Sequence, residues 1–357
     1  MRMKRWISRF GLLVLLGGCG PWLSGCRADA DVQPAEEVPG ATVPGNFPAP
    51  VYGPEKNPPT RAAFELGRKL FYDRRLSRDN TVSCGSCHQQ FAAFAHAGHQ
   101  LSHGIDNQFG TRNAPALQNL RWKTDFMWDG GPVALENMPL APITNPVEMG
   151  ETLENVLRKL NADADYRQRF EEVYGGSGAI TSYQFLRALA QFTAALTSAN
   201  SRYDRYVRHE TGGTLSDAEL RGLVVVRQKC GSCHTGELFT DESFRNNGLD
   251  RRFALDSGRA HITGRPQDVG RFKVPSLRNI ALTAPYMHDG RFETLTQVLD
   301  HYDHGMVESR TLDAQLRRLG QAPGIALTAA ERQDLLAFLA TLTDEQFLRN
   351  PQLADQP

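Results

Sequence analysis

No charge of one sign dominates this chain. Of its 357 residues, 40 are lysine or arginine and 40 are aspartate or glutamate, so the formal net charge is zero. A protein that binds nucleic acid through its phosphates usually carries an excess of basic residues. The balance therefore argues against nucleic acid as a partner, although it leaves room for local charged patches.

Long hydrophobic runs are also scarce. Beyond the N-terminus, no segment is long and apolar enough to predict a transmembrane helix. Four basic residues within the first nine precede an apolar run over 10–16, which is too short to span a bilayer. This pattern predicts an export signal over residues 1–26, and a short membrane anchor is the alternative.

Cysteine is sparse as well, because the chain has only six. Four of them belong to two copies of the sequence Cys-Gly-Ser-Cys-His, at residues 84–88 and 230–234. The other two, Cys19 and Cys26, lie at the end of the signal region, so none remains for a structural disulfide. The sequence before Cys26 is similar to a bacterial lipoprotein cleavage site, and Cys19 is a weaker match. We therefore expect a periplasmic protein that is lipid-anchored at Cys26 or Cys19.

The repeated motif has the spacing that attaches c-type haem. Two thiols add to the haem vinyl groups, and the histidine that follows offers its imidazole to the iron. A redox dithiol or half of a zinc site is the alternative, but a zinc site would need a second pair of ligands close by. Two copies in an exported chain predict two covalently bound haem c groups, held by Cys84, Cys87, His88, Cys230, Cys233 and His234.

Strand patterns are rare, and the periodic segments are helical. Thr60 is a plausible N-cap, and capping-box patterns occur at 216–219 and 328–331. Apolar stripes at helical spacing over 153–160 and 185–196 predict core helices. A leading helix, a haem motif and a closing helix form the minimal plan of a cytochrome c domain. We therefore predict a mainly α protein with two cytochrome c-like haem domains packed together, long loops and little β structure.

Further motifs make the chain resemble the bacterial di-haem cytochrome c peroxidase and MauG family from about residue 60 to residue 348. Besides the haem motifs, they lie at 70–77, 112–115, 128–130, 145–149, 272–279 and 285–290. The resemblance implies a peroxidatic N-terminal haem that receives electrons from the C-terminal haem. The predicted parts are a signal peptide (1–26), a flexible linker (27–59), an N-terminal peroxidatic haem domain (60–208), a C-terminal electron-transfer haem domain (209–348) and a tail (349–357).

For the N-terminal haem, the resemblance implies His88 as the proximal ligand and Glu148 as the distal acid–base group. A carboxylate over the iron can move a proton between the peroxide oxygens. His103 lies where many of these peroxidases have a removable sixth ligand, and a surface histidine is the alternative. We expect His96 and His99 at the pocket rim or on the surface.

Between the haems, Trp128 matches a tryptophan that conducts electrons, and a packed core residue is a compatible reading. The resemblance also implies a calcium ion near the haem interface. Its ligands would be oxygen atoms, as a hard cation prefers. They would come from the side chain of Asn113 and the backbone carbonyls of Thr283 and Pro285.

The C-terminal haem is where the chain departs from ordinary peroxidases. His234 is its expected proximal ligand. Peroxidases have a methionine as the sixth ligand, but the corresponding residue here is Tyr302, as in MauG-like proteins. A phenolate favours oxidised iron and a thioether favours reduced iron, so this choice bears on the redox potential. Met306 and Met287 are the alternatives.

These features support several functions. The first is a peroxidase that reduces hydrogen peroxide to water with electrons from a small periplasmic cytochrome c or cupredoxin. The second is a MauG-like, peroxide-dependent oxidase of tryptophan or tyrosine residues in a partner protein. The third is a plain electron-transfer cytochrome, which would not need a distal acid such as Glu148. Dimers are common in the family, so a homodimer is compatible with the sequence. At positions 131 and 138 this chain has glycine and methionine, where members of the family commonly have other residues.

Overall fold

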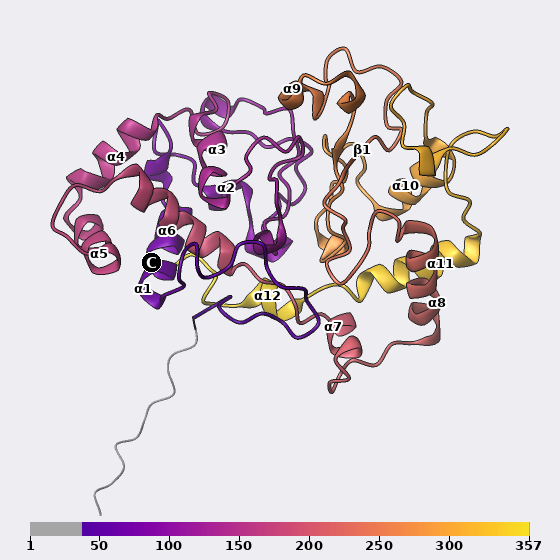
Figure 1. Ribbon diagram of the computed structural model, residues 1–357, viewed down its shortest axis with the longest axis horizontal. Helices are drawn as coiled ribbons and strands as arrows, with labels where there is room; N and C mark the ends of the chain where they lie inside the picture. The colour runs from indigo at the N-terminus through magenta and orange to yellow at the C-terminus, as the bar shows by residue number, and fades with distance from the viewer. Residues whose placement is uncertain (1–37, 357) are drawn as a thin grey trace, which may run out of the picture. The chain divides into compact units, whose positions relative to one another are not determined.

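The computed structural model describes residues 38–356 (Figure 1). The predicted signal peptide, both Cys19 and Cys26, and the first part of the predicted linker lie outside this range. No helix of the described chain is long and apolar enough to cross a membrane.

The described chain is mainly helical, as the sequence predicts. The α-helices are α1 (Arg61–Tyr72), α2 (Cys84–Cys87), α3 (Leu140–Thr144), α4 (Leu153–Ala162), α5 (Ala164–Tyr174), α6 (Ser182–Ala195), α7 (Arg202–Val207), α8 (Asp217–Val225), α9 (Ala260–Thr263), α10 (Leu295–Asp300), α11 (Ala329–Ala340) and α12 (Glu345–Arg349). Within the described residues, the only strands are β1 (Phe244–Arg245) and β2 (Phe272–Lys273), which pair antiparallel with Phe244 opposite Lys273.

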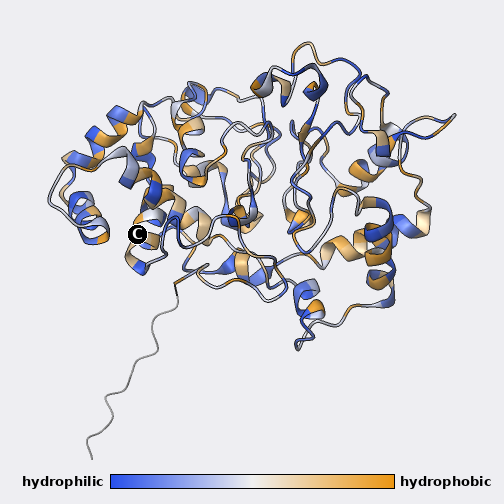
Figure 2. Cartoon of the chain, viewed as in Figure 1, coloured by the Kyte–Doolittle hydropathy of each residue, from blue (hydrophilic) through white to orange (hydrophobic). Residues whose placement is uncertain are grey.

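Local capping explains where the main helices begin. Thr60 caps α1 by accepting a hydrogen bond from the backbone of Ala63. The two predicted capping boxes begin α8 and α11. In each, the N-cap side chain accepts a hydrogen bond from the backbone of a glutamate three residues later, and the side chain of that glutamate accepts one from the N-cap backbone. These three helix starts are confirmed. In Figure 2, helices such as α4 and α8 carry both hydrophilic and hydrophobic residues, as expected of helices with one face on a core.

Two hydrophobic cores organise the described residues. The larger core is built around α1, α4, α5 and α6, where Phe64, Phe71 and Phe192 are fully buried. The second core is built around α8 and α11, with Phe239 and Phe338 at its centre. Each core lies beside one haem motif, because Cys84 packs against the first core and Cys230 packs against the second.

A buried polar network connects segments from both halves of the chain. Arg278 and Asp204 form an ion pair of 2.7 Å in which both side chains have no exposure to solvent. Asn279 donates to the hydroxyl of Ser198 at 2.9 Å and also contacts the side chain of Gln118. Since buried polar groups are costly unless they are paired, this network fixes the relative position of the segments that it joins.

Part of the predicted linker and part of the predicted tail pack against the rest of the described chain. Of the residues predicted as a flexible linker, Phe47, Tyr52 and Asn57 are buried, and Phe47 lies edge-on to Trp122 at 5.0 Å. The predicted tail also packs on the body, where Leu353 is buried in the first core. Both segments bury their apolar side chains against residues far away in sequence, which local composition does not reveal.

The end of the predicted C-terminal domain also returns to the first core. Phe347 and Leu348, both in α12, are members of that core, and Phe347 lies 5.6 Å from Phe94 between ring centroids. Tyr72 in α1 donates to the carbonyl of Leu353 at 2.8 Å. The C-terminal label in Figure 1 accordingly stands next to α1.

Candidate functional site

The first haem motif forms one helical turn that ends at its histidine. Cys84 and Cys87, the two ends of α2, are both free thiols. The Nδ1 atom of His88 lies 2.7 Å from the carbonyl oxygen of Phe94. This hydrogen bond sets the ring orientation and leaves Nε2 for a metal ion, an arrangement common to metal-binding histidines.

The second haem motif repeats this arrangement. A π-helical segment, Val226–Cys230, continues α8 into the motif, and Cys230 and Cys233 are free thiols. The Nδ1 atom of His234 lies 3.2 Å from the carbonyl oxygen of Phe239. Burial lowers the pKa of both His234 and His88, which keeps the imidazoles in the neutral form that binds metals.

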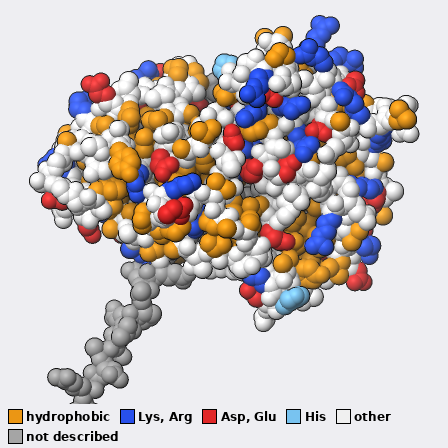
Figure 3. All heavy atoms as spheres, in the orientation of Figure 1, with side chains coloured by type: hydrophobic (Ala, Val, Ile, Leu, Met, Phe, Trp, Pro, Cys, Tyr) orange, Lys and Arg blue, Asp and Glu red, His pale blue; other side chains and the backbone are white. Residues whose placement is uncertain are grey.

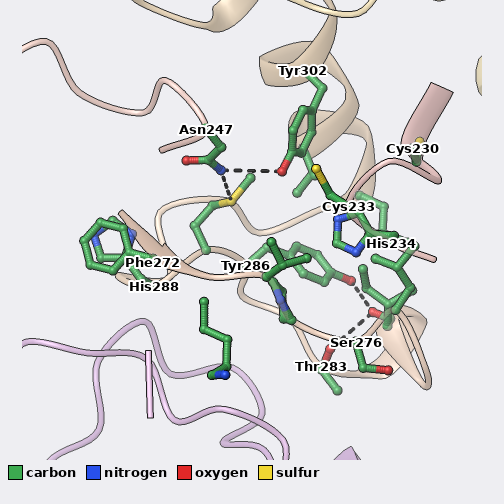
Figure 4. Close-up of a pocket in the computed structure, with 18 of the residues that line it drawn as sticks. Cys230, Cys233, His234, Asn247, Phe272, Ser276, Thr283, Tyr286, His288 and Tyr302 are labelled. Carbon is green, nitrogen blue, oxygen red and sulfur yellow. Dashed lines mark hydrogen bonds between the residues drawn. The ribbon is translucent and has the colours of Figure 1, made fainter. Parts of the chain in front are cut away.

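A cavity of about 260 Å³ opens beside the second motif (Figure 4). His234 lies on its wall together with Tyr302, Met287 and Asn247. The other lining side chains are largely apolar and include Val274, Leu277, Leu299, Leu335 and Leu339. Paired free thiols, an imidazole with one free nitrogen and an apolar cavity are the donor set and surroundings that a covalently bound haem requires, so the residues present fit haem c.

The residues proposed as the sixth ligand of the second haem occupy different environments. Tyr302 and Met287 line the cavity, whereas Met306 does not line it and is buried with Leu312 and Leu316 in a small cluster against which Tyr302 packs. Burial raises the pKa of Tyr302 to about 12, so its hydroxyl is protonated in the metal-free chain at neutral pH. A cation bound at His234 would favour the phenolate.

Glu148 lies close to the first haem motif. Its carboxylate accepts a hydrogen bond of 2.7 Å from Asn145, and its carbonyl accepts one of 2.8 Å from Ile105. Burial raises the pKa of Glu148, an effect that outweighs the hydrogen bond from Asn145. Burial also raises the pKa of the Cys87 thiol, and the nearby charge of Glu148 adds to this effect. A half-buried carboxyl group with a raised pKa is suited to general acid–base chemistry.

The three loop histidines form a cluster beside the same motif. The rings of His96 and His99 are stacked at 4.0 Å, and the ring of His103 lies 5.5 Å from that of His99. His96 is buried, contrary to the expected position at the rim or surface, and its Nδ1 contacts the hydroxyl of Ser102 at 3.0 Å. Burial, together with the charges of neighbouring histidines, lowers the pKa of His96 to about 4. His96 is therefore a neutral packing residue.

Trp128 lies on the wall of the same cavity, between segments of the two halves. Its indole nitrogen donates to the carbonyl of Asn113 at 2.9 Å, and its own carbonyl accepts from the backbone of Lys273 in β2 at 2.9 Å. One hydrogen bond thus fixes the indole ring, and the other fixes the backbone of the same residue. The electron-transfer role of Trp128 stays a prediction.

Comparisons with known proteins agree on one family. The sequence model for the di-haem cytochrome c peroxidase family matches residues 61–212. The methylamine utilization protein MauG of Methylorubrum extorquens is 34% identical over 308 residues, which cover 84% of this chain and 83% of that protein. The chain belongs to the di-haem cytochrome c peroxidase family. It is therefore a peroxidase-type oxidoreductase, and this family implies two haem c groups, hydrogen peroxide and a redox partner.

Other relatives come from both branches of this family. The cytochrome c551 peroxidase of Nitrosomonas europaea is 32% identical, covering 79% of this chain and 80% of that protein. A solved MauG-like protein associated with microbial copper homeostasis is 37% identical, with a TM-score of 0.77, covering 88% of this chain and 98% of that chain. The diheme peroxidase BthA of Burkholderia thailandensis shares the fold, with a TM-score of 0.70 at 24% identity over 90% of this chain and 98% of that chain.

The residues predicted to bind calcium all lie on the wall of one cavity. Asn113, Thr283 and Pro285 all line the cavity beside Trp128. The side-chain nitrogen of Asn113 donates to the carbonyls of His99 and Gln100, both at 3.1 Å. Its side-chain oxygen is therefore turned away from those carbonyls, and the calcium assignment stays a prediction.

Sequence reasoning missed two features of the site. The side chain of Asn247 contacts both Tyr302 and Met287, but Asn247 belongs to no recognised motif. The only sequence signal for it is the unusual length of its loop. The stack of Phe272 on His288, with ring centroids 3.6 Å apart, is the other. Both residues of that stack lie in motifs of the family, but their contact depends on the fold.

Proposed function

We propose that this enzyme reduces hydrogen peroxide to water at a haem held by Cys84, Cys87 and His88. The haem iron, when bound, supplies the redox chemistry. The half-buried carboxyl group of Glu148 carries the proposal, because it lies beside the first haem motif and burial raises its pKa, as suits a group that transfers a proton between the peroxide oxygens. A plain electron carrier has no use for such a group.

The electrons would come from a small donor protein, either a cytochrome c or a cupredoxin, and pass through the second motif. Trp128 supports this route, because it lines the cavity that contains His234 and also contacts Asn113, which follows the histidine loop of the first motif. His103 would block the first iron in the resting state and leave on reduction of the second. An electron paramagnetic resonance spectrum of the oxidised protein, which reports whether each iron is high-spin or low-spin, tests this resting ligation.

A basic surface supports an acidic donor. Figure 3 shows lysine and arginine side chains gathered around α9. In the sequence this region holds the exposed residues Arg251, Arg252 and Arg265, and Leu255 is fully exposed among them. Arg251 lies only two positions after Leu249, which lines the cavity beside the second motif.

The test of the proposed function is steady-state turnover. The holoprotein is mixed with hydrogen peroxide and reduced cytochrome c or cupredoxin, and oxidation of the donor is followed by absorbance. We expect donor oxidation that depends on peroxide. If peroxide changes the absorbance of neither haem, with or without prior reduction, the protein is an electron carrier and the proposal is wrong.

A MauG-like oxidase is the second candidate, and Tyr302 favours it. A tyrosine hydroxyl lines the cavity opposite the region of His234, where a thioether would suit an ordinary peroxidase. Such an enzyme would take electrons from tryptophan or tyrosine residues of a partner protein. Peroxide added without a donor would then leave a long-lived oxidised form of the enzyme. Slow or absent turnover with both cytochrome c and cupredoxin would exclude the first candidate, the peroxidase that uses a small donor protein.

We further propose that the protein is exported to the periplasm and anchored by a lipid at Cys26 or Cys19, and that calcium binds at Asn113, Thr283 and Pro285. Mass spectrometry of the mature protein tests the anchor, since lipidation adds a defined mass to an N-terminal cysteine. Metal analysis before and after treatment with a chelator tests the calcium site.

A further inference from the structure

We infer that Asn247 is a positioning residue that presents Tyr302 and Met287 as alternative ligands for the haem that the second motif would hold. This inference rests on the proposed haem at the second motif but not on the reaction that the first haem performs. The contacts of Asn247 with Tyr302 and Met287 do not follow from the family motifs.

The contacts of Asn247 carry the inference. Its side-chain nitrogen lies 3.5 Å from the hydroxyl oxygen of Tyr302 and 3.5 Å from the sulfur of Met287. A primary amide nitrogen has two hydrogens, so it can donate to both acceptors at once. Figure 4 shows dashed lines from the amide nitrogen of Asn247 to the Tyr302 hydroxyl and to a sulfur atom, with His234 on the far side of Tyr302 from Asn247.

Two backbone irregularities bring these ligands into the cavity. Helix α10 continues into a π-helical segment, His301–Gly305, which carries Tyr302. Single π-helical turns are rare and often occur at functional sites. Met287 has a φ angle of 75°, a left-handed conformation that is unfavourable for a residue with a side chain. The fold thus holds both residues in conformations that the chain alone would not favour.

Asn247 is itself fixed to the segment that carries Tyr302. Its carbonyl oxygen lies 2.9 Å from the Nε2 atom of His301, which is buried. The next residue, Gly248, accepts a hydrogen bond from the backbone of Val307 at 2.9 Å. The amide therefore keeps its place relative to Tyr302, and a change at Asn247 would alter the competition between the ligands without removing either.

The chemistry of the two ligands makes the choice important. A phenolate oxygen is a hard donor that stabilises oxidised iron, whereas a thioether is a soft donor that stabilises reduced iron. An amide that donates to the phenolate lowers its electron density, and loss of that hydrogen bond changes how the two ligands compete. Asn247 would thereby tune the potential at which the second haem accepts electrons.

The experiment compares haem ligation in purified holoprotein variants. Methionine bound to ferric haem gives a charge-transfer band in the near infrared. We expect Tyr302→Phe to gain this band and to have a higher midpoint potential, and the double variant Tyr302→Phe/Met287→Leu to lose the band. Met306→Leu is the matched control, because Met306 is buried outside the cavity, and Tyr302→Phe/Met306→Leu should keep the band.

The role of Asn247 is tested separately by Asn247→Leu, which has a similar size but no donor. We expect a shifted midpoint potential and an altered ligand signal in absorbance and electron paramagnetic resonance. Asn247→Gln, which keeps an amide, should restore part of the wild-type signal. A Tyr302→Phe protein without a methionine band overturns Met287 as the alternative ligand, and an Asn247→Leu protein with wild-type spectra and potential overturns the role of Asn247.

These measurements need no peroxide turnover. A protein that fails to reduce peroxide with any donor can still show the exchange of ligands, in which case only the proposed function fails. An active peroxidase whose Tyr302→Phe variant lacks the methionine band keeps the proposed function and loses this inference.

Discussion

Glu148 shows how a single carboxyl group acquires a chemical role from its surroundings. It lies in a loop where most glutamates are solvated, but here burial raises its pKa and Asn145 fixes one of its oxygens. We expect Glu148→Gln to slow peroxide cleavage by about a hundred- to ten-thousand-fold, because the amide keeps the shape and cannot transfer the proton. Stopped-flow absorbance after mixing with peroxide measures this rate.

Glu154→Gln is the matched control, since Glu154 is an exposed glutamate in the first turn of α4. Its rate should equal that of the wild type. A Glu148→Gln protein that also reacts at the wild-type rate would remove the carboxyl group from the mechanism.

The ion pair between Arg278 and Asp204 gives a second prediction for a single residue. Both side chains are fully buried, so Arg278→Met leaves the charge of Asp204 without its cationic partner and should cost about 3–5 kcal/mol of unfolding free energy. Urea unfolding followed by circular dichroism measures the change. The control is Arg221→Met, because Arg221 is largely exposed in its pair with Asp334 and exposed pairs contribute about 1 kcal/mol or less.

The same pair predicts a dependence on pH. Burial alone would raise the pKa of Asp204, but hydrogen bonds and the charge of Arg278 outweigh it and hold the pKa below its usual value. The pKa of Asp204 is lower in the folded protein than in the unfolded chain, so the pair makes its full contribution to stability when the pH is above the unfolded pKa. This contribution to stability is lost as the pH falls through the folded pKa of Asp204. The stability difference between wild type and Arg278→Met should therefore shrink in acid, and a difference that is constant with pH would contradict this assignment.

Single residues were predictable where chemistry depends on local spacing. The cysteines and histidines of both motifs are such residues, since haem attachment fixes their order along the chain. Asn247 could not be predicted, because its partners Tyr302 and Met287 lie 55 and 40 positions away in the sequence. The burial of His96 likewise depends on how its loop folds over Ser102.

At the scale of elements, the helix starts were predictable and the packing of the chain ends was not. Caps at Thr60, Ser216 and Thr328 involve residues three positions apart, so the sequence displays them directly. The burial of Phe47 and Phe347 involves contacts with distant elements. The local composition of the predicted linker, which is rich in proline and glycine, therefore gave no sign that its side chains are buried.

The return of α12 to the first core leads to a further prediction. Phe347 is 4% exposed and contacts Phe94, so Phe347→Ala should lower the unfolding free energy by about 3–5 kcal/mol. Thermal or urea unfolding of the holoprotein measures the loss. Phe91→Ala is the control, because Phe91 is 64% exposed and such surface changes usually stay within about 0.5 kcal/mol. Equal effects of the two changes would contradict the packing of α12.

At the scale of the whole molecule, a chain without net charge has an uneven surface. The exposed arginines near α9 favour an acidic donor, so kcat/KM for reduced cytochrome c or cupredoxin of negative net charge should fall as ionic strength rises. We expect Arg251→Glu/Arg252→Glu to lower kcat/KM about tenfold or more at low salt and to weaken its salt dependence.

The control for this prediction is Arg158→Glu/Arg167→Glu, which makes the same change in net charge on α4 and α5 at exposed positions. Its effect should be small. If both double variants reduce kcat/KM equally, total charge and not the patch near α9 steers the donor.

The position of the last residues has a consequence for biosynthesis. The first core contains Phe347, Leu348 and Leu353, so a chain that is still being synthesised lacks part of that core until nearly all of it has been made. Folding of the N-terminal half is therefore completed only when the last residues are available, although the cysteines of the first motif come early in the chain. A truncated translation product that ends before Phe347 would leave the apolar side chains of this core without some of their packing partners.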